Sequence, residues 1–123
     1  LKPVDREDIL NQVAVFKKEG VEAVAVCFMN SFANPEHEKI AGKIISEELP
    51  EAYLTLSTDI LPSIRFYDRV STTVLNSYVG PILRRYLNAL LAKLKKVDYQ
   101  GILLIMQSNG GVVAPEIAMD RAA

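Results

Sequence analysis

The stretch Val21–Phe28 reads VEAVAVCF, a nearly continuous apolar run that is rich in β-branched residues. This composition is typical of a strand in a parallel sheet that helices cover on both faces. A helix is expected before it, over residues 5–19, and another after it, from Asn34-Pro35-Glu36 to Leu49-Pro50. A second short strand is expected over residues 53–57. This succession predicts an α/β fold whose parallel strands are joined by a right-handed crossover.

The helical spacing of apolar residues predicts which faces of these two helices pack against the sheet. In the first helix, Asp5 is the expected N-cap and Gly20 the expected C-cap. Its apolar stripe consists of Ile9, Leu10, Val13 and Phe16. In the second helix, the residues expected to face the core are Ile40, Ala41, Ile44 and Ile45.

The longest expected element is a helix from roughly Arg65 to Val97. Its apolar residues form a broad stripe that needs extensive burial: Leu75, Val79, Ile82, Leu83, Tyr86, Leu87, Leu90, Leu91 and Leu94. Gly80-Pro81 interrupts this helix, because a proline there cannot donate a hydrogen bond to the carbonyl of Ser77. We therefore expect either a kink or two abutting helices at this point.

The stretch Ile102–Gly111, ILLIMQSNGG, changes abruptly from apolar residues to a polar backbone closed by glycines. It predicts a third parallel strand near residues 102–106, in a three-layer arrangement with the other two. Its last three residues tolerate backbone angles that most residues avoid, and glycine lets a ligand approach the main chain closely. The loop Ser108–Gly111 is therefore either a plain turn or a backbone cradle for a ligand. Ala114-Pro115-Glu116 is expected to begin a short final helix.

Polar residues recur at spacings of three and four in the first half of the long helix, which places them on one face. Arginine and hydroxyl groups near the positive end of a helix suit a carboxylate, an imide or a phosphate group. The alternative is an ordinary solvated helix surface. The candidate substrate- or phosphate-binding residues are Arg65, Arg69, Thr72, Thr73 and Asn76 in the helix, and Ser108, Asn109, Gly110 and Gly111 in the loop.

Two carboxylates lie at the edges of expected elements, Asp59 and Asp68. They could orient a metal-bound water or act as a base, or they could cap helices. The sequence alone identifies no catalytic residue.

Composition excludes several classes of protein. The formal net charge of −1 over 123 residues argues against a nucleic-acid binder. Cys27 is the only cysteine, which rules out an internal disulfide and indicates a reducing compartment, so a cytoplasmic protein is expected. Cys27 lies in an apolar run and is expected to be buried, whereas His37 is expected at the surface. No apolar run is long enough to span a membrane, and no His/Cys metal cluster is expected.

Phosphate-binding motifs are missing from these 123 residues. The sequence contains no GxxxxGK[ST] loop, no GxGxxG and no GxSxG elbow. It begins without methionine and ends without a terminating signal. We therefore expect this chain to be a piece of a longer protein. We also expect that this piece, by itself, does not turn over a nucleotide.

Three segments resemble the hydantoinase A / N-methylhydantoinase (ATP-hydrolysing) / 5-oxoprolinase family. The first is Gly20–Phe28 followed by Ser31–Glu38, and the second is Leu61–Arg65 followed by Tyr67–Asn76. The third is Ile105–Gly111, IMQSNGG. Asp68 and Val70 stand where the family more often has Glu and Thr. The matches occur in order and cover nearly the whole chain.

The resemblance implies an ATP-dependent hydrolase that opens cyclic amides such as hydantoin, N-methylhydantoin or 5-oxoproline. It implies an actin-like/sugar-kinase (RNase H-like) ATPase fold, with residues 1–64 ending one α/β domain, 65–101 forming the connecting helix and 102–123 starting a second domain. ATP and Mg²⁺ are then expected for the parent protein and no cofactor for this piece alone, which is expected to be inactive in isolation. A hydantoinase B-type partner subunit is also implied.

Three alternatives remain open at this point. The chain could be a non-catalytic module that self-associates through exposed apolar faces. It could belong to the ATPase subunit of an acetone or acetophenone carboxylase-like enzyme, which the same family includes. It could also come from a sugar-kinase-like phosphotransferase, which would need the same missing phosphate motifs.

Overall fold

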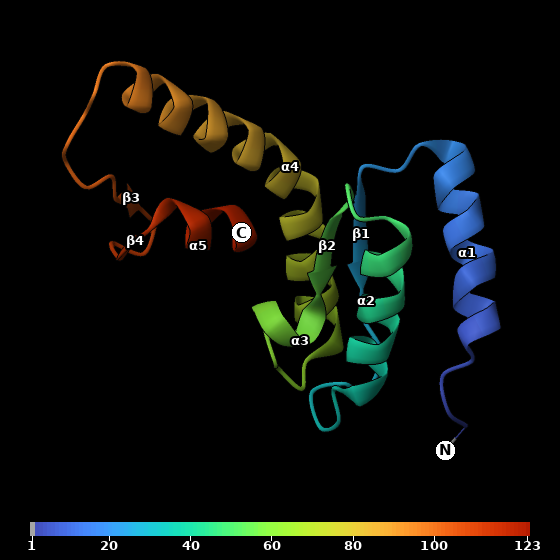
Figure 1. Ribbon diagram of the computed structural model, residues 1–123. Coiled ribbons are helices and arrows are strands. Elements are labelled where there is room, and N and C mark those ends of the chain that lie inside the picture. Colours follow the sequence, from blue (N-terminus) through green and yellow to red (C-terminus); the bar gives the residue numbers. More distant parts are fainter. Residues whose placement is uncertain (1) are drawn as a thin grey trace.

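A computed structural model describes residues 2–123 of the chain. The elements follow in the order α1 (Arg6–Glu19), β1 (Ala23–Val26), α2 (Glu36–Glu48), β2 (Tyr53–Leu56), α3 (Ser57–Ile60), α4 (Phe66–Lys96), β3 (Ile105–Met106), β4 (Val112–Val113) and α5 (Pro115–Asp120). Figure 1 shows a first part built on β1 and β2, and a second part at the far end of α4.

A parallel pair of strands, β1 and β2, forms the centre of the first part. Ala23 pairs with Tyr53 at one end of the pair and Val26 with Leu56 at the other. The helices α1 and α2 lie on one side of this pair and the first half of α4 lies on the other (Figure 1). The predicted α/β class with a short parallel sheet covered by helices is therefore confirmed.

The core of the first part joins α1, α2 and one face of the sheet. Its buried residues are Val13, Val24, Val26, Ala41 and Ile45. The prediction that Ile40 faces this core is wrong, because its side chain is 45% exposed. The buried face of α2 is centred near Ala41, and successive helical residues point about 100° apart, so Ile40 points to the side. Ile44 is buried, as predicted.

The predicted helix ends are confirmed for α1. The Glu7 N–H donates to Asp5 Oδ1 over 3.0 Å at the start of the helix. Gly20 ends it with a φ of 66°, a left-handed conformation that favours glycine. At the start of α2, the Glu36 N–H donates to Asn34 Oδ1 over 3.0 Å, so Asn34 stabilises the first turn. The helix begins one residue later than expected, at Glu36, with Pro35 as its N-cap.

Helix α4 runs through Pro81 without a break, over 31 residues. Of the two alternatives at Gly80-Pro81, the one with two abutting helices is therefore wrong. Figure 1 shows the axis of α4 changing direction between the half beside the sheet and the half that leaves it. A second core lies at this far half, where Leu87 packs with Ala118 and Met119 of α5.

The prediction of a third parallel strand is wrong. Of residues 102–106, only Ile105 and Met106 form a strand. They pair antiparallel with Val113 and Val112 of β4. Asn109-Gly110 is a strong turn signal between two short apolar runs, so residues 105–113 form a local hairpin. Between β2 and α4, Ser57–Ile60 form the short helix α3, for which the sequence analysis made no prediction. The final helix α5 begins at Pro115, as expected.

Among residues 2–123, no helix combines the length and the apolar character that crossing a membrane requires.

Candidate functional site

Two buried polar clusters and one polar cavity lie beside the two parallel strands or just after their ends. The first cluster, which we call the Glu38 cluster, lies where both parallel strands end. Glu38 is fully buried, and its Oε1 accepts hydrogen bonds from the hydroxyls of Ser31 and Ser57, both at 2.6 Å. The N–H of Phe28 donates to the same oxygen at 2.7 Å, and the N–H of Thr58 donates to Oε2 at 3.1 Å. The carboxylate thus joins the segments that follow β1 and β2.

The Glu38 cluster requires an ionised carboxylate. Burial acts to raise the pKa of Glu38, but the hydrogen bonds from Ser31, Ser57 and the N–H groups of Phe28 and Thr58 together hold this pKa below its ordinary value. All four groups donate, and a carboxylate only accepts. With no exposed surface and both oxygens engaged, Glu38 stabilises the fold and is not available as a general base.

Arg69 stabilises the same end of the sheet from α4. Its guanidinium donates to the carbonyls of Phe28 and Met29, and over 2.8 Å to that of Ser63. The guanidinium carbon lies 5.7 Å and 5.6 Å from the ring centroids of Phe32 and Phe66. Arg69 is fully buried, and its Nε has no hydrogen-bond partner among the described residues. It therefore holds the loop after β1 against the start of α4.

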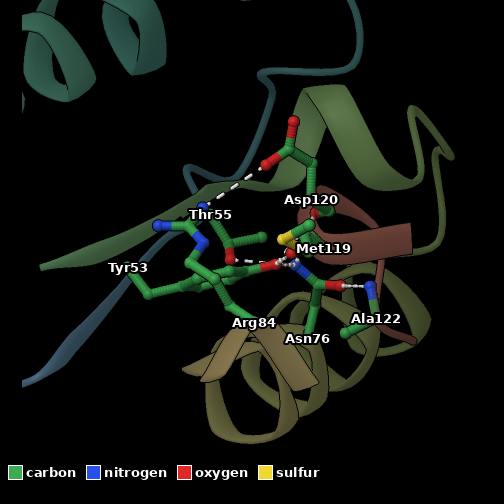
Figure 2. Close-up of polar contacts among 7 residues, drawn as sticks. All are labelled: Tyr53, Thr55, Asn76, Arg84, Met119, Asp120 and Ala122. Carbon is green, nitrogen blue, oxygen red and sulfur yellow. Dashed lines mark hydrogen bonds and ion pairs between the residues drawn. The ribbon is translucent and has the colours of Figure 1, made fainter. Parts of the chain in front are cut away.

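The second cluster, the Asn76 cluster, binds the end of the chain to the sheet (Figure 2). Asn76 Nδ2 donates to Thr55 Oγ1 at 3.1 Å and to the carbonyl of Asp120 at 3.2 Å. Its Oδ1 accepts from the N–H groups of Ala122 at 2.7 Å and Ala123 at 3.0 Å. Every polar atom of the buried amide is thus satisfied by two segments that lie far apart in the sequence.

Tyr53 completes the Asn76 cluster. Its hydroxyl donates to the carbonyl of Met119 at 2.7 Å and accepts from Asn76 Nδ2 at 3.3 Å. Burial raises the pKa of the Tyr53 phenol, so the hydroxyl stays protonated and remains a donor. This tyrosine positions the end of α5 and does not supply a base.

A polar cavity of about 290 Å³ lies beside β2, and we call it the β2 cavity. It is lined by the four residues of β2 and by Asp59, Ile60, Arg84, Asp120 and Arg121. The Arg84 guanidinium lies 4.5 Å from the centroid of the Tyr53 ring and 3.3 Å from Asp120 Oδ1 (Figure 2). Two arginines and two aspartates at one cavity can bind a small molecule that carries both a carboxylate and an N–H group.

The structure separates the five helix residues predicted to bind substrate or phosphate. Arg69, Thr73 and Asn76 share the face that packs on the sheet and are fully buried. Arg65 is exposed and Thr72 is partly exposed, so they point elsewhere. Both threonine hydroxyls donate to carbonyls of their own helix, four residues back, at 2.8 Å for Thr72 and 2.6 Å for Thr73.

The loop Ser108–Gly111 forms the turn of the β3–β4 hairpin. Gly110 has a φ of 85°, and the Gly111 N–H donates to Asn109 Oδ1 at 2.8 Å. All four loop residues are exposed. Figure 1 shows this hairpin well apart from the start of α4, so within this chain the loop and the helix residues do not form one site.

The remaining candidates occupy separate places. Asp59 lines the β2 cavity, whereas Asp68 lies in the first turn of α4 with its Oδ2 at 3.9 Å from Arg65 Nη1. The expectation that Cys27 is buried is wrong, because its side chain is partly exposed. His37 is also partly exposed. Within residues 2–123, no three His, Cys, Asp or Glu side chains are close enough to hold a metal ion.

Sequence reasoning missed Glu38, Tyr53 and Arg84. Glu38 has the position of an ordinary acidic residue in the first turn of a helix, and Tyr53 that of an ordinary strand residue. One available signal was the pair of serines, Ser31 and Ser57, which lie in the segments that follow the two strands. The carboxyl ends of parallel strands meet at one edge of a sheet, so polar residues there are expected to lie close together.

Comparison with known proteins matches most of the chain. The family described as Hydantoinase/oxoprolinase N-terminal region matches residues 1–49, and the one described as Hydantoinase/oxoprolinase matches residues 69–123. The crystal structure of the ATP-dependent caprolactamase from Pseudomonas jessenii superposes with a TM-score of 0.87 at 33% sequence identity. That superposition covers 94% of this chain and 17% of the caprolactamase chain.

Curated relatives give the same result. The chain is 33% identical to caprolactamase subunit alpha of P. jessenii over 120 residues, or 98% of this chain and 17% of that subunit. It is 31% identical to the 5-oxoprolinase of Saccharomyces cerevisiae over 113 residues, or 92% of this chain and 9% of the relative. It is 30% identical to the acetophenone carboxylase gamma subunit of Aromatoleum aromaticum, over 90% of this chain and 16% of that subunit. The chain thus spans less than a fifth of the length of these relatives.

Proposed function

Because the chain belongs to the hydantoinase/oxoprolinase family, we propose that it is part of an ATP-dependent hydrolase that opens cyclic amides. The proposed substrates are hydantoin, N-methylhydantoin, 5-oxoproline or a related lactam. Overall, the cyclic amide and one water give the ring-opened acid, while ATP and a second water give ADP and phosphate. The coupling serves to activate an amide carbonyl, which is a poor electrophile.

The observation that carries this proposal is the match to an ATP-dependent caprolactamase along nearly the whole chain, at 33% identity and a TM-score of 0.87. A likeness of this extent in both sequence and structure supports a shared type of reaction. The relative named 5-oxoprolinase supports the same class, because 5-oxoproline is also a cyclic amide. The names of both relatives indicate cyclic amides as substrates. Because the two rings differ, the names do not identify which cyclic amide this protein opens.

We propose that residues 1–64 end a first α/β domain and that residues 102–123 start a second domain of an actin-like ATPase fold. Residues 65–101 form the long helical connection between the two domains. Two separate hydrophobic cores support this division. One joins α1, α2 and the sheet, and the other joins the far half of α4 to α5 and the hairpin. The β2 cavity lies where residues of both parts meet, and small-molecule sites often occur at such junctions.

Within this chain, we assign ligand contacts to residues that a ligand can reach. These are Arg65 and Thr72 at the start of α4 and the backbone of Ser108–Gly111. Arg69, Thr73 and Asn76 are assigned a supporting role, because each is fully buried and engaged in hydrogen bonds. The residues that bind ATP and Mg²⁺ are assigned to other parts of the protein, because the 123 residues contain none of the glycine-rich phosphate-binding motifs.

Two relatives are named as subunits, one of a caprolactamase and one of an acetophenone carboxylase. We therefore propose that the protein works with a second subunit of the hydantoinase B type. We also propose that it works in the cytoplasm, because a single cysteine is typical of a protein from a reducing compartment. The carboxylase relative also supports a second candidate function, in which the chain belongs to the ATPase subunit of a ketone carboxylase.

One experiment separates these functions. The full-length protein, with its partner subunit, is incubated with ATP and Mg²⁺ and with each of 5-oxoproline, hydantoin, N-methylhydantoin, caprolactam, and acetophenone plus bicarbonate. Mass spectrometry detects the product. We expect a cyclic amide to gain the mass of one water. Carboxylated acetophenone would instead establish the second candidate, and no product from any compound would contradict both.

A further inference from the structure

Two fully buried residues of opposite charge, Glu38 and Arg69, bind the same residue just after β1. The N–H of Phe28 donates to Glu38 Oε1 at 2.7 Å, and the carbonyl of Phe28 accepts a hydrogen bond from Arg69 Nη2. Glu38 lies on α2 and Arg69 on α4, and these helices cover opposite sides of the sheet (Figure 1). The backbone of Phe28 is therefore held from both sides of the sheet at once.

Each of these two charged side chains also binds the segment that follows β2. Glu38 Oε1 accepts from the Ser57 hydroxyl at 2.6 Å, and its Oε2 accepts from the Thr58 N–H at 3.1 Å. Arg69 Nη1 donates to the carbonyl of Ser63 at 2.8 Å. The segments that follow the two parallel strands are thus joined twice, once by a carboxylate and once by a guanidinium.

Glu38 and Arg69, which together we call the strand-end clamp, are a costly way to stabilise a fold. A carboxylate and a guanidinium lose their hydration when they are buried, and well-packed apolar side chains of similar size often give equal or greater stability. Among the described residues, the two charges form no direct ion pair with each other that would offset this cost. What they supply is a set of directional hydrogen bonds that fixes one backbone conformation.

The strand-end clamp lies where α/β folds commonly bind their ligands. Because β1 and β2 are parallel, residues 28–31 and 57–63 leave the sheet at the same end, the carboxyl end of both strands. In open α/β sheets, ligands bind in the crevice outside the carboxyl ends of the strands. Groups that meet a ligand must be held to within about 0.5 Å, and buried hydrogen bonds from neighbouring elements provide that support.

We propose that Glu38 and Arg69 are positioning residues for the ring-opening reaction, which hold residues 28–31 and 57–63 in the geometry that turnover requires. Both are fully buried, so they act through the backbone of these segments and not by touching the substrate. This proposal rests on the proposed function, the ATP-dependent opening of a cyclic amide. A displacement of about 1 Å at a positioned group can slow a reaction on the order of a hundredfold. A loosened clamp should therefore lower kcat and change KM little.

The test compares kcat and KM of full-length variants, each with the partner subunit, ATP, Mg²⁺ and the cyclic amide that the wild type opens. We expect Glu38→Gln and Arg69→Lys each to lower kcat by roughly tenfold or more and to change KM by less than about threefold. Arg69→Lys keeps the positive charge but loses the planar fork that reaches carbonyls of both segments. Because both residues act on Phe28, the double variant should lose little more kcat than the more impaired single variant.

Val13→Ala is the matched control for a general loss of stability. Val13 is buried in the core of the first part and takes no part in the strand-end clamp, so its truncation should lower the melting temperature and leave kcat within about twofold of the wild type. Ser57→Ala is a milder clamp variant, which removes one of the four donors to Glu38 and should lower kcat by roughly threefold. Circular dichroism at the assay temperature establishes which variants are folded.

The outcomes separate the positioning role from the proposed function. Folded clamp variants with the kcat of the wild type would overturn the positioning role, as would an equal loss of kcat in Val13→Ala. Losses of kcat that multiply in the double variant would overturn it too, because they would show that the two residues act independently. A wild type that opens no cyclic amide would instead refute the proposed function, and the positioning role with it.

Discussion

Glu38→Gln is expected to lower the free energy of unfolding by about 3 kcal/mol, because the amide replaces one of two oxygens that together accept four hydrogen bonds. The new NH₂ group must face a hydroxyl or a backbone N–H, and at least one buried donor loses its acceptor. Urea unfolding followed by circular dichroism measures the change. The matched control is Glu36→Gln, two residues earlier in the same first turn but exposed, for which we expect a change of less than about 0.5 kcal/mol.

The same carboxylate makes stability depend on pH. The pKa of Glu38 is held below its ordinary value of 4.5 in the folded chain, so the unfolded chain binds the proton more tightly. The stabilisation is therefore complete above that ordinary value and is lost as the pH falls through the folded pKa. Unfolding of Glu38→Gln should depend less on pH in this acidic range than unfolding of the wild type. Identical pH profiles, or equal losses in the two Gln variants, would show that the carboxylate does not hold the strand ends together.

Gly80→Ala is expected to destabilise the chain by roughly 2–3 kcal/mol, although alanine favours helices more than glycine does. A Cβ at Gly80 would lie 2.2 Å from the ring of Tyr53, far inside van der Waals contact. The ring cannot move freely, because its hydroxyl is fixed by the Asn76 cluster and Arg84 lies over its face. The close approach of α4 to β2 therefore depends on the absence of a side chain at this position.

Gly42→Ala is the matched control for this prediction. Its Cβ would meet the two methyl groups of Leu56 at 2.8 Å and 3.0 Å, and these lie at the end of a flexible side chain. We expect the gain in helix propensity to offset much of that cost, so that the net change stays below about 1 kcal/mol. Thermal melts of both variants distinguish the two cases. A Gly80→Ala protein as stable as Gly42→Ala would show that α4 does not pack on Tyr53 in this way.

The sequence predicted the first part of the fold well because local and tertiary preferences agree there. Asp5 and Gly20 have cap chemistry that operates within a few residues of the chain. The run that contains β1 is apolar on both sides, and helices do cover both sides. At residues 102–106 the same kind of apolar run gave a wrong prediction. The turn at Asn109-Gly110 provides a local antiparallel partner, so these residues join a hairpin instead of the parallel sheet.

The candidate site was harder to predict, because its polar residues bind across long sequence separations. Arg69 was expected to meet a ligand, yet its guanidinium is taken up by carbonyls of residues 28, 29 and 63. Asn76 was expected on the same binding face, yet it binds the last residues of the chain. The spacing of a helix shows which side chains share a face, as it did for Arg69, Thr73 and Asn76. It does not show what lies opposite that face.

The proposed hydrolase is tested most directly by the ratio of ADP released to cyclic amide opened. The full-length protein with its partner subunit is assayed for both products on the same samples, with ATP, without ATP and without the cyclic amide. We predict one ADP for each ring opened, no ring opening without ATP, and little ADP release without the cyclic amide. Ring opening at the same rate without ATP, or ADP release that the cyclic amide does not stimulate, would contradict an ATP-dependent cyclic amide hydrolase.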